Sequence, residues 1–165
     1  MKKRPVRKQN RIQNYDYSQD GAYFVTICTK DREALLGEII VGDGLARPAH
    51  ISLTNYGIIV ANELQQIPSY YDIVDVNQYA IMPNHIHMII TIGCTTTERK
   101  KPLPTLGNIV GGFKSGVSRL CGFSLWQRSF HDHVIRDYAD YCRIAEYIVN
   151  NPATWERDIH FVTDS

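Results

Sequence analysis

The sequence predicts one α+β domain in which helices pack against an antiparallel sheet. Strand-like and helix-like segments alternate along the chain, and two strand-like segments are separated by only two residues, as in a hairpin. The length of 165 residues suits one domain, and the 44% hydrophobic and 21% charged residues indicate a globular chain. No apolar run reaches the ~18 residues that a membrane span needs, so we do not expect a membrane protein.

The first half of the chain contains a strand, an excursion and a helix. Residues 21–29 are rich in β-branched and aromatic side chains, which indicates a central strand. Residues 35–53 combine glycines, a proline and short apolar runs, and we expect a hairpin or another structured excursion there. Between residues 54 and 67 the apolar positions follow helical spacing, and Pro68 predicts the end of that helix.

A pair of strands and a second helix follow. Residues 73–82 and 85–92 are strand-like, and Pro83-Asn84 between them indicates a turn. Residues 93–104 have the composition of an exposed loop. The apolar residues of 105–121 fall on one helical stripe, but this helix also holds several glycines and needs tertiary packing to be stable. Those glycines allow either tight packing on the sheet or close approach of a phosphate backbone.

The last two elements complete the order of the fold. Residues 128–136 predict a strand, and Asp137 is a good N-cap for a helix that runs to Asn150 or Asn151 and stops at Pro152. The predicted order is therefore β, excursion, α, β, β, α, β, α. A βαββαβ core with two helices on one face of an antiparallel sheet is the ferredoxin-like arrangement, to which the last helix is an addition.

Basic residues are concentrated in two acid-free segments, although the formal net charge is only +1. Residues 1–11 and residues 99–131 each hold six Lys or Arg and no Asp or Glu. Two such segments favour local binding to nucleic acid over the alternative of a solvated tail and a solvated helix face. The residues expected to contact the nucleic acid are Arg4, Arg7, Lys8, Arg11, Arg99, Lys100, Lys101, Lys114, Arg119 and Arg128.

The cysteines and the absence of a phosphate-binding loop narrow the class of protein. Cys28, Cys94, Cys121 and Cys142 lie far apart in the sequence, with no C-x-x-C or zinc spacing. We therefore expect reduced thiols in a cytoplasmic protein. The sequence contains no G-x-x-x-x-G-K-[ST] motif, so we expect no nucleotide cofactor.

His85 and His87 form the sharpest local feature of the chain. Side chains alternate along a strand, so both imidazoles point to one face, with Cβ atoms ~7 Å apart, while Ile86 points into the core. Two imidazoles on one face suit a divalent metal, although many such pairs are ordinary polar residues. His131 and His133 form a second pair that is either a decoy or a contributor to the same site.

Tyr147 and Asn151 lie on one side of the last predicted helix because they are four residues apart. Asn151 offers a carbonyl oxygen, a suitable third ligand for Mg²⁺ or Mn²⁺. Tyr147 offers a phenol oxygen that can act as a covalent nucleophile, or the residue simply packs the helix on the sheet. Because the helix stops at a proline and can shift as a unit, we expect Tyr147 to lie out of line for attack when no DNA is bound.

Taken together, these features resemble the single-tyrosine HUH transposases, and within them the REP-associated tyrosine transposase type. The matching stretches occur in the order of the family and cover the chain from about residue 10 to residue 155. They are Tyr15-Asp16-Tyr17-Ser18, the run from Ala22 to Thr29, Met82-Pro83-Asn84-His85-Ile86-His87, the run from Trp126 to Phe130, the run from His133 to Arg136, and the run from Glu146 to Pro152.

The resemblance implies a function and a set of roles. His85 and His87 would be metal ligands, Asn151 the third ligand and Tyr147 the nucleophile that attacks single-stranded DNA and becomes linked to the 5′ phosphate. The insertion-sequence branch of the family usually has Gln where this chain has Asn151, whose side chain is one methylene shorter. The implied cofactor is Mg²⁺ or Mn²⁺, and the implied partner is single-stranded or hairpin DNA.

The resulting expectation is a transposase-like endonuclease and strand transferase. It would have a basic arm at residues 1–20, one HUH domain at 21–155 and a tail at 156–165. One alternative is a non-catalytic domain that grips hairpin DNA or RNA and whose histidines are structural. Another alternative is a small metal-dependent phosphohydrolase, which would leave both product ends free. The sequence leaves open whether the chain is a monomer or a homodimer.

Overall fold

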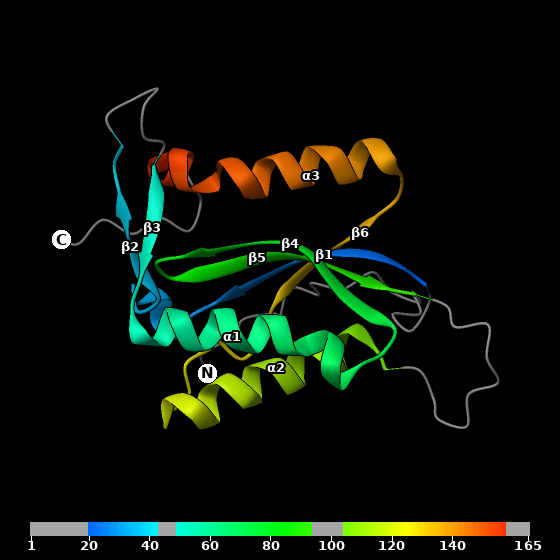
Figure 1. Cartoon of the computed structure of the whole chain (residues 1–165), viewed down its shortest axis with the longest axis horizontal. Coiled ribbons are helices and arrows are strands. Elements are labelled where there is room, and N and C mark those ends of the chain that lie inside the picture. Colours follow the sequence, from blue (N-terminus) through cyan, green and yellow to red (C-terminus); the bar gives the residue numbers. More distant parts are fainter. Residues whose placement is uncertain (1–19, 43–48, 94–103, 158–165) are drawn as a thin grey trace, which may run out of the picture.

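The computed structural model describes residues 20–42, 49–93 and 104–157, which form a four-stranded sheet flanked by helices (Figure 1). Neighbouring strands are antiparallel, and the order across the sheet is β4-β5-β1-β6. The strands are β1 (Gly21–Cys28), β4 (Val74–Met82), β5 (His85–Ile92) and β6 (His131–Ile135). This is the strand order of a ferredoxin-like βαββαβ core, so the predicted α+β fold class is confirmed.

Helices cover both faces of the sheet. α1 (Asn55–Tyr70) and α2 (Leu106–Cys121) lie on one face, and α3 (Tyr138–Asn150) lies on the other (Figure 1). No helix within the described ranges is long and apolar enough to cross a membrane. The remaining elements are the turn η1 (Lys30–Arg32), the hairpin of β2 (Gly37–Ile40) and β3 (His50–Leu53), and η2 (Asn151–Arg157), which directly follows α3.

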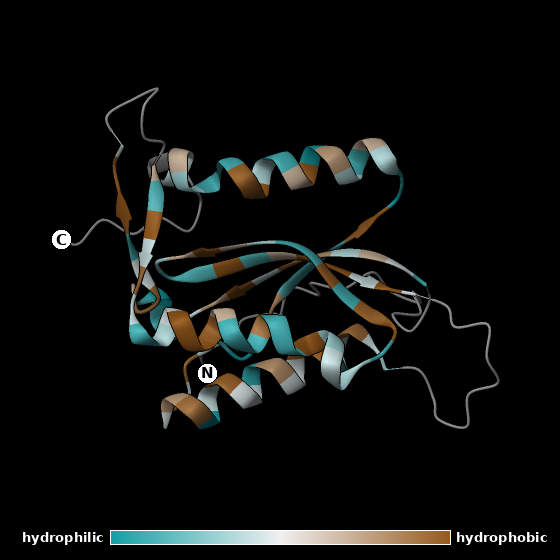
Figure 2. Ribbon diagram, in the orientation of Figure 1, coloured by the Kyte–Doolittle hydropathy of each residue, from teal (hydrophilic) through white to brown (hydrophobic). Residues whose placement is uncertain are grey.

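The sheet buries apolar side chains on both faces because helices cover both. Val25 and Ile86, from β1 and β5, belong to the large core beneath α1 and α2. On the other face Ile89 packs with Ile144 and Ile148 of α3 in a smaller cluster. Hydrophobic and hydrophilic residues alternate along the helices and strands, as expected of elements with one buried side (Figure 2). The smaller cluster leaves room on the α3 face for polar side chains.

Two predicted boundaries differ from the structure. Pro68 does not end α1, which continues to Tyr70, because a proline so near the end removes only one hydrogen bond and the buried Leu64 and Ile67 hold the last turn on the core. β6 begins at His131 rather than at residue 128. α3 ends at Asn150 as predicted, and the chain then passes through Pro152 in the separate element η2, because a proline is tolerated in the first turn of a helix.

Glycines of α2 allow close packing between α2 and α1. A Cβ atom on Gly116 would lie 2.6 Å from Oε2 of Glu63, and one on Gly112 would lie 3.1 Å from the hydroxyl of Tyr71. Both neighbours belong to α1 or the residue that follows it. At these two positions the structure favours the packing interpretation over contact with a phosphate backbone, although the partner is α1 rather than the sheet.

Candidate active site

The register of the sheet places the two histidines on the face covered by α3. His87 on β5 lies opposite Thr26 on β1, and Thr26 lies opposite His131 on β6. Residues directly opposite each other share a face, and residues two apart along a strand share it too, so His85 belongs to this face. Ile86 between the histidines is buried in the core on the other face. The two imidazoles therefore lie side by side, as the strand pattern predicts.

The imidazoles of His85 and His87 point their Nε2 atoms at each other. These atoms are 3.0 Å apart, and the ring centroids are 4.4 Å apart. Both side chains are buried. On the outer side of the pair, Nδ1 of His85 lies 2.9 Å from Oδ1 of Asn84, and Nδ1 of His87 lies 2.8 Å from Oγ1 of Thr26. Each ring is thus held by a polar neighbour on the side away from the pair.

Asn84 determines which nitrogen of His85 carries the hydrogen. Its Nδ2 donates to the backbone carbonyl of Arg32 at 3.2 Å, so its Oδ1, which only accepts, faces the ring. Nδ1 of His85 therefore carries the hydrogen, and Nε2 of the neutral ring carries a lone pair. The hydroxyl of Thr26 can hold His87 in the same tautomer. The 3.0 Å between the two Nε2 atoms suits a proton shared by the two rings or a cation bound beside both.

The carbonyl that orients Asn84 belongs to a strained turn. Asp31 and Arg32 of η1 have φ angles of 55° and 58°, a left-handed backbone that residues other than glycine rarely adopt. The turn places the Arg32 carbonyl against Asn84 and the Arg32 side chain along the groove above His87. Backbone strain of this kind is typical of functional sites, because the surrounding structure must hold it in place.

α3 brings Tyr147 to the same site. Its hydroxyl lies 3.3 Å from Nε2 of His87, and the two ring centroids are 5.2 Å apart. Phe24 stacks on His87 at 5.3 Å and meets Tyr147 edge-on at 6.1 Å. The helix is anchored by the buried Ile144 and Ile148. Tyr147 thus lies close to the histidines, because apolar packing holds α3 on the sheet.

The chain after α3 contributes two more residues. Asn151 is fully buried at the junction of α3 and η2. Trp155 of η2 stacks on His85, with ring centroids 5.7 Å apart and an interplanar angle of 26°. The sequence analysis did not identify Trp155. Its only signal is an aromatic residue eight positions after Tyr147, which is too weak to indicate a contact with a histidine on β5.

An open groove of about 710 Å³ runs over His87 and Tyr147. Its lining contains two arginines and two further histidines but no acidic side chain. The other lining residues are Phe24, Thr26, Arg32, His131, His133, Arg143 and Ile144. A groove with one sign of charge attracts an anion such as phosphate. His131 and His133, the second histidine pair of the sequence, therefore line the same groove as His87.

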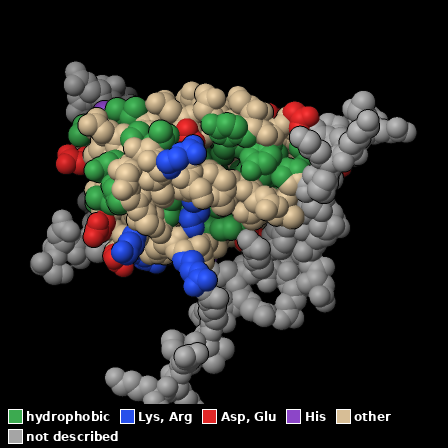
Figure 3. All heavy atoms as spheres, turned by 90° about the horizontal axis from the view of Figure 1, so that it is seen from below, with side chains coloured by type: hydrophobic (Ala, Val, Ile, Leu, Met, Phe, Trp, Pro, Cys, Tyr) green, Lys and Arg blue, Asp and Glu red, His purple; other side chains and the backbone are tan. Residues whose placement is uncertain are grey.

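Three of the basic residues expected to bind nucleic acid lie away from this lining: Lys114, Arg119 and Arg128. Lys114 and Arg119 are on α2, on the sheet face opposite α3, and Figure 3 shows Lys and Arg on that side interspersed with acidic and hydrophobic residues. Nζ of Lys114 donates to the carbonyls of Gln127 at 2.6 Å and Arg128 at 3.1 Å, and burial lowers the pKa of this ammonium group. Its first role is therefore to hold the segment before β6.

The other seven predicted basic contacts lie outside the described residues. They are Arg4, Arg7, Lys8, Arg11, Arg99, Lys100 and Lys101. In contrast, the sequence analysis missed Arg32 and Arg143, which line the groove. Arg143 is four residues before Tyr147, and this helical spacing is the signal that could have found it.

Proteins similar in sequence to this chain are known from Haemophilus influenzae. No protein-family model matches the chain. An uncharacterized protein of Haemophilus influenzae is 35% identical over 175 aligned residues, which cover 94% of this chain and 93% of the relative. A second protein of that organism, named "Putative REP-associated tyrosine transposase", is 26% identical over 154 residues, covering 86% of this chain and 76% of the relative.

A solved structure shows the same fold. It is a REP-associated tyrosine transposase bound to a REP hairpin, with a TM-score of 0.62 and 19% identity, covering 93% of this chain and 92% of the other. The chain is thus similar to REP-associated tyrosine transposases, in sequence to one relative with that name and in fold to one solved structure.

Proposed function

We propose that the protein is a transposase-like single-stranded DNA endonuclease and strand transferase, with Tyr147 as nucleophile and a divalent metal held by His85 and His87. The observation that carries this proposal is the convergence of three side chains at one site, two of which line the groove. The Tyr147 hydroxyl lies 3.3 Å from Nε2 of His87, which lies 3.0 Å from Nε2 of His85. The names of the relatives support a transposase at the level of the family.

The donor set fits a hard divalent cation that also binds phosphate. Ligands at ~2.1 Å are ~3.0 Å apart in an octahedral site and ~3.4 Å apart in a tetrahedral one. The 3.0 Å between the two Nε2 atoms is short enough for one ion to bind both, and Mg²⁺ or Mn²⁺ would take oxygen ligands at its other positions. Among the described residues, no group of three or more His, Cys, Asp or Glu could hold a metal. The remaining ligands would therefore be oxygens, from Asn151, water and the DNA phosphate.

The residues of the chain then have separate tasks. His85 and His87 would hold the ion, which when bound would make the phosphorus more electrophilic and offset its developing charge. Once Nε2 of His87 is a ligand, its lone pair no longer accepts a hydrogen bond from Tyr147, and the hydroxyl can turn toward the groove. Asn151, buried where α3 ends, would complete the ligand set from the same helical path that carries Tyr147.

The proposed reaction exchanges one phosphate ester for another. The phenol oxygen of Tyr147 forms a bond to phosphorus, and the bond between phosphorus and the 3′ oxygen breaks. The phenol proton is lost, and the 3′ oxygen gains one. The product is a 5′-phosphotyrosine linkage and a free 3′-hydroxyl, which can later reverse the step on another strand. The ester linkage conserves the bond energy, so no ATP is needed.

The proposed substrate is hairpin DNA with single-stranded flanks. The groove over His87 and Tyr147 is open and lined by arginines and histidines, which suits a single strand threaded across the sheet. Phe24 in the groove offers an aromatic surface for an unpaired base. The hairpin-bound neighbour supports the choice of a hairpin partner.

A labelled-oligonucleotide experiment tests the proposal. The full chain is incubated with a flanked hairpin oligonucleotide and Mg²⁺ or Mn²⁺. A 3′-labelled strand should give labelled protein, and a 5′-labelled strand should give a free fragment that a polymerase can extend. Cleavage with both ends free would support a phosphohydrolase instead. If the protein binds the oligonucleotide but cleaves it at no position, the result would support a non-catalytic hairpin-binding domain.

Asn84→Ala is expected to weaken divalent metal binding by about 10–100-fold, as the loss of a residue that orients a ligand typically does. The change removes the acceptor that holds the hydrogen on Nδ1 of His85. Calorimetry in the presence of the oligonucleotide measures the effect. Asn55→Ala, at the exposed start of α1, is the matched control. Equal metal affinity in the Asn84 variant and the wild type would contradict the assigned tautomer.

Replacing all six basic residues of positions 1–11 by Gln is expected to reduce the salt dependence of DNA binding. Each lost phosphate contact lowers the slope of log affinity against log salt by ~0.7 for single strands. The order of preference among different oligonucleotides should stay the same, because phosphate contacts carry no sequence information. An unchanged slope would mean that this arm only aids solubility.

A further inference from the structure

We propose that the edge of the groove where β6 meets α3 is a second phosphodiester subsite. In this subsite Arg143 and His133, both held by Asp140, take a backbone phosphate next to the one that Tyr147 attacks. The inference rests on the proposed function, because it assumes that a DNA strand crosses the same groove. Asp140 is a positioning residue in this proposal, and Arg143 and His133 are the groups that touch the DNA.

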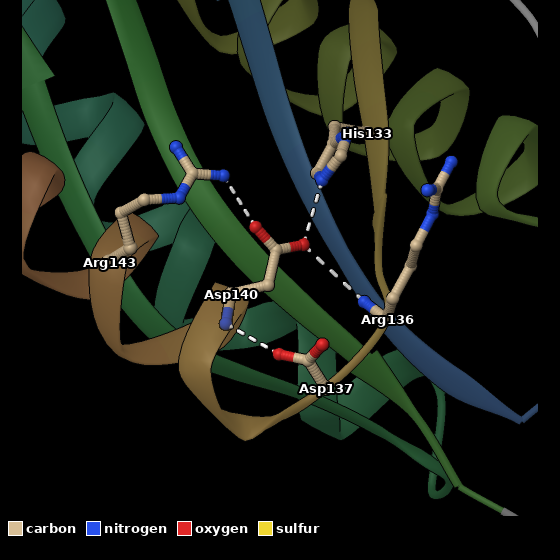
Figure 4. Close-up of polar contacts among 5 residues, drawn as sticks. All are labelled: His133, Arg136, Asp137, Asp140 and Arg143. Atoms are coloured by element: carbon tan, nitrogen blue, oxygen red, sulfur yellow. Dashed lines mark hydrogen bonds and ion pairs between the residues drawn. The ribbon is translucent and has the colours of Figure 1, made fainter.

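A network of hydrogen bonds centres on Asp140 (Figure 4). Its Oδ2 lies 2.9 Å from Nε2 of His133 and accepts from the backbone N–H of Arg136 at 3.4 Å. Its Oδ1 accepts from Nη2 of Arg143 at 2.5 Å. The backbone N–H of Asp140 donates to Oδ1 of Asp137, the N-cap of α3, at 2.8 Å. One carboxylate thus holds a histidine from β6 and an arginine from α3.

In this network the carboxylate of Asp140 is less exposed to solvent than its partners His133 and Arg143. The side chain of Asp140 is 15% exposed, whereas those of His133 and Arg143 are 45% and 72% exposed. The hydrogen bond with His133, followed by that with Arg143, lowers the pKa of Asp140 to about 2, so the carboxylate is ionised at neutral pH. Asp140 does not line the groove, but both of its partners do. A strand in the groove therefore meets Arg143 and His133 before it meets the carboxylate.

Arg143 has donors left for a phosphate. A guanidinium carries five N–H groups in a planar fork. Only one nitrogen of the Arg143 guanidinium, Nη2, donates to Asp140. That fork can grip a phosphate with two parallel hydrogen bonds, which a single cationic point charge cannot do. The carboxylate limits the rotamers of the long side chain, so less conformational entropy is lost when the phosphate binds.

The position of Arg143 sets which phosphate it can reach. It lies four residues before Tyr147, about 6 Å away along the axis of α3 and on the same side of the helix. The groove contains both side chains. Arg143 is therefore placed to bind the phosphate next to the attacked one, while the attacked phosphate lies at His87 and Tyr147. A strand held at two successive points would be oriented for attack at the first.

The test measures binding separately from cleavage. Anisotropy of a fluorescent flanked hairpin oligonucleotide is recorded with EDTA over a range of salt concentrations. Arg143→Gln should lower the affinity about tenfold and the salt slope by ~0.7, as expected when one phosphate contact is lost. Arg136→Gln is the control, because it removes one charge from the same edge while its guanidinium points away from Asp140 (Figure 4). Equal affinity and slope in Arg143→Gln and wild type would overturn the subsite.

Asp140→Asn distinguishes positioning from simple electrostatics by the sign of its effect. Removing an acid beside DNA should tighten binding if charge alone matters. If Asp140 positions Arg143 and His133, the variant should bind the same probe several-fold more weakly. Tighter binding would overturn the positioning role. Circular dichroism and the melting temperature check that α3, whose N-cap Asp137 is unchanged, remains folded.

A backbone substitution in the DNA locates the subsite. One phosphate at a time is replaced by an uncharged methylphosphonate in the flanked hairpin probe. Wild-type protein should lose affinity at the position that Arg143 contacts, and Arg143→Gln should show no further loss there. An equal loss in both proteins at every position would overturn the subsite. These measurements need no cleavage, so failure of the proposed nucleophile would appear only in the adduct experiment.

Discussion

Tyr147→Phe is expected to abolish the covalent protein–DNA adduct, with a loss of at least about a thousandfold. In covalent catalysis the nucleophile has no substitute, and the residual rate falls toward the uncatalysed one. The hairpin affinity should change little, because the phenyl ring keeps its contacts with Phe24 and His87. Only the hydroxyl at 3.3 Å from His87 is lost. This combination of results separates an enzyme from a binding domain.

The matched control is Tyr138→Phe on the same helix. Tyr138 is 81% exposed near the start of α3, so the same chemical change there should leave adduct formation unaltered. Isolation of the trapped adduct and sequencing of the modified peptide identify the nucleophile directly. Recovery of the DNA on Tyr138 or Tyr141 would refute the assignment of Tyr147.

His85→Ala is expected to produce the second large effect, a loss of detectable divalent metal binding together with loss of the adduct. His85 supplies one of the two imidazoles that converge at 3.0 Å, and the described residues contain no cluster of three or more His, Cys, Asp or Glu that could hold the metal without it. Calorimetry with Mn²⁺ and the hairpin oligonucleotide measures the affinity. Adduct formation at wild-type rates in this variant would show that the reaction does not depend on a metal at the pair.

The histidine is fully buried, so the variant must be separated from a folding defect. Trp155 stacks on the ring of His85. Truncation of His85 to Ala leaves a cavity, and loss of a buried ring typically lowers the free energy of unfolding by ~3 kcal/mol. His87→Gln, which keeps a polar side chain at the other ligand position, is the second variant. His50→Ala on the exposed strand β3 is the control for loss of an imidazole. Melting temperatures of all three establish that the chain is folded.

Tyr147→Phe and His85→Ala should lose adduct formation for different reasons. Tyr147→Phe removes the nucleophile but keeps both imidazoles, so it should still bind Mn²⁺ in the presence of DNA. His85→Ala removes a ligand but keeps the tyrosine, so added metal in excess should restore part of the adduct if the site is only weakened. Loss of metal binding in the tyrosine variant would indicate that the phenol is itself a ligand.

Much of the fold could be predicted from the sequence because its signals are local. Two strand-like runs on either side of Pro83-Asn84 identified β4 and β5, and the alternation of side chains along a strand placed His85 and His87 on one face with Ile86 on the other. Asp137 was identified as the N-cap of α3, where its side chain accepts from the backbone N–H of Asp140. Caps and alternation depend on neighbours within four residues, so the sequence alone contains the needed information.

The set of predicted basic contacts shows where local reasoning fails. Acid-free segments mark candidates by composition, but Lys114 and Arg119 lie on α2, across the sheet from Tyr147. Composition carries no information about which face of a sheet a helix covers. Arg32 and Arg143, which do line the groove, lie in segments that also contain acids and were passed over for that reason.

The sequence by itself determined the strand and helix order, the shared face of the two histidines and the placement of Tyr147 on the last helix. The tertiary structure decided the rest: the contact between Tyr147 and His87, the stacking of Trp155 on His85, the orientation of Asn84 by the Arg32 carbonyl, and the network around Asp140. Apart from the contacts within α3, each of these joins residues on different elements. The physical reason is that such contacts depend on the crossing of α3 over the sheet and on strand register, which arise from packing of the whole core rather than from any local pattern.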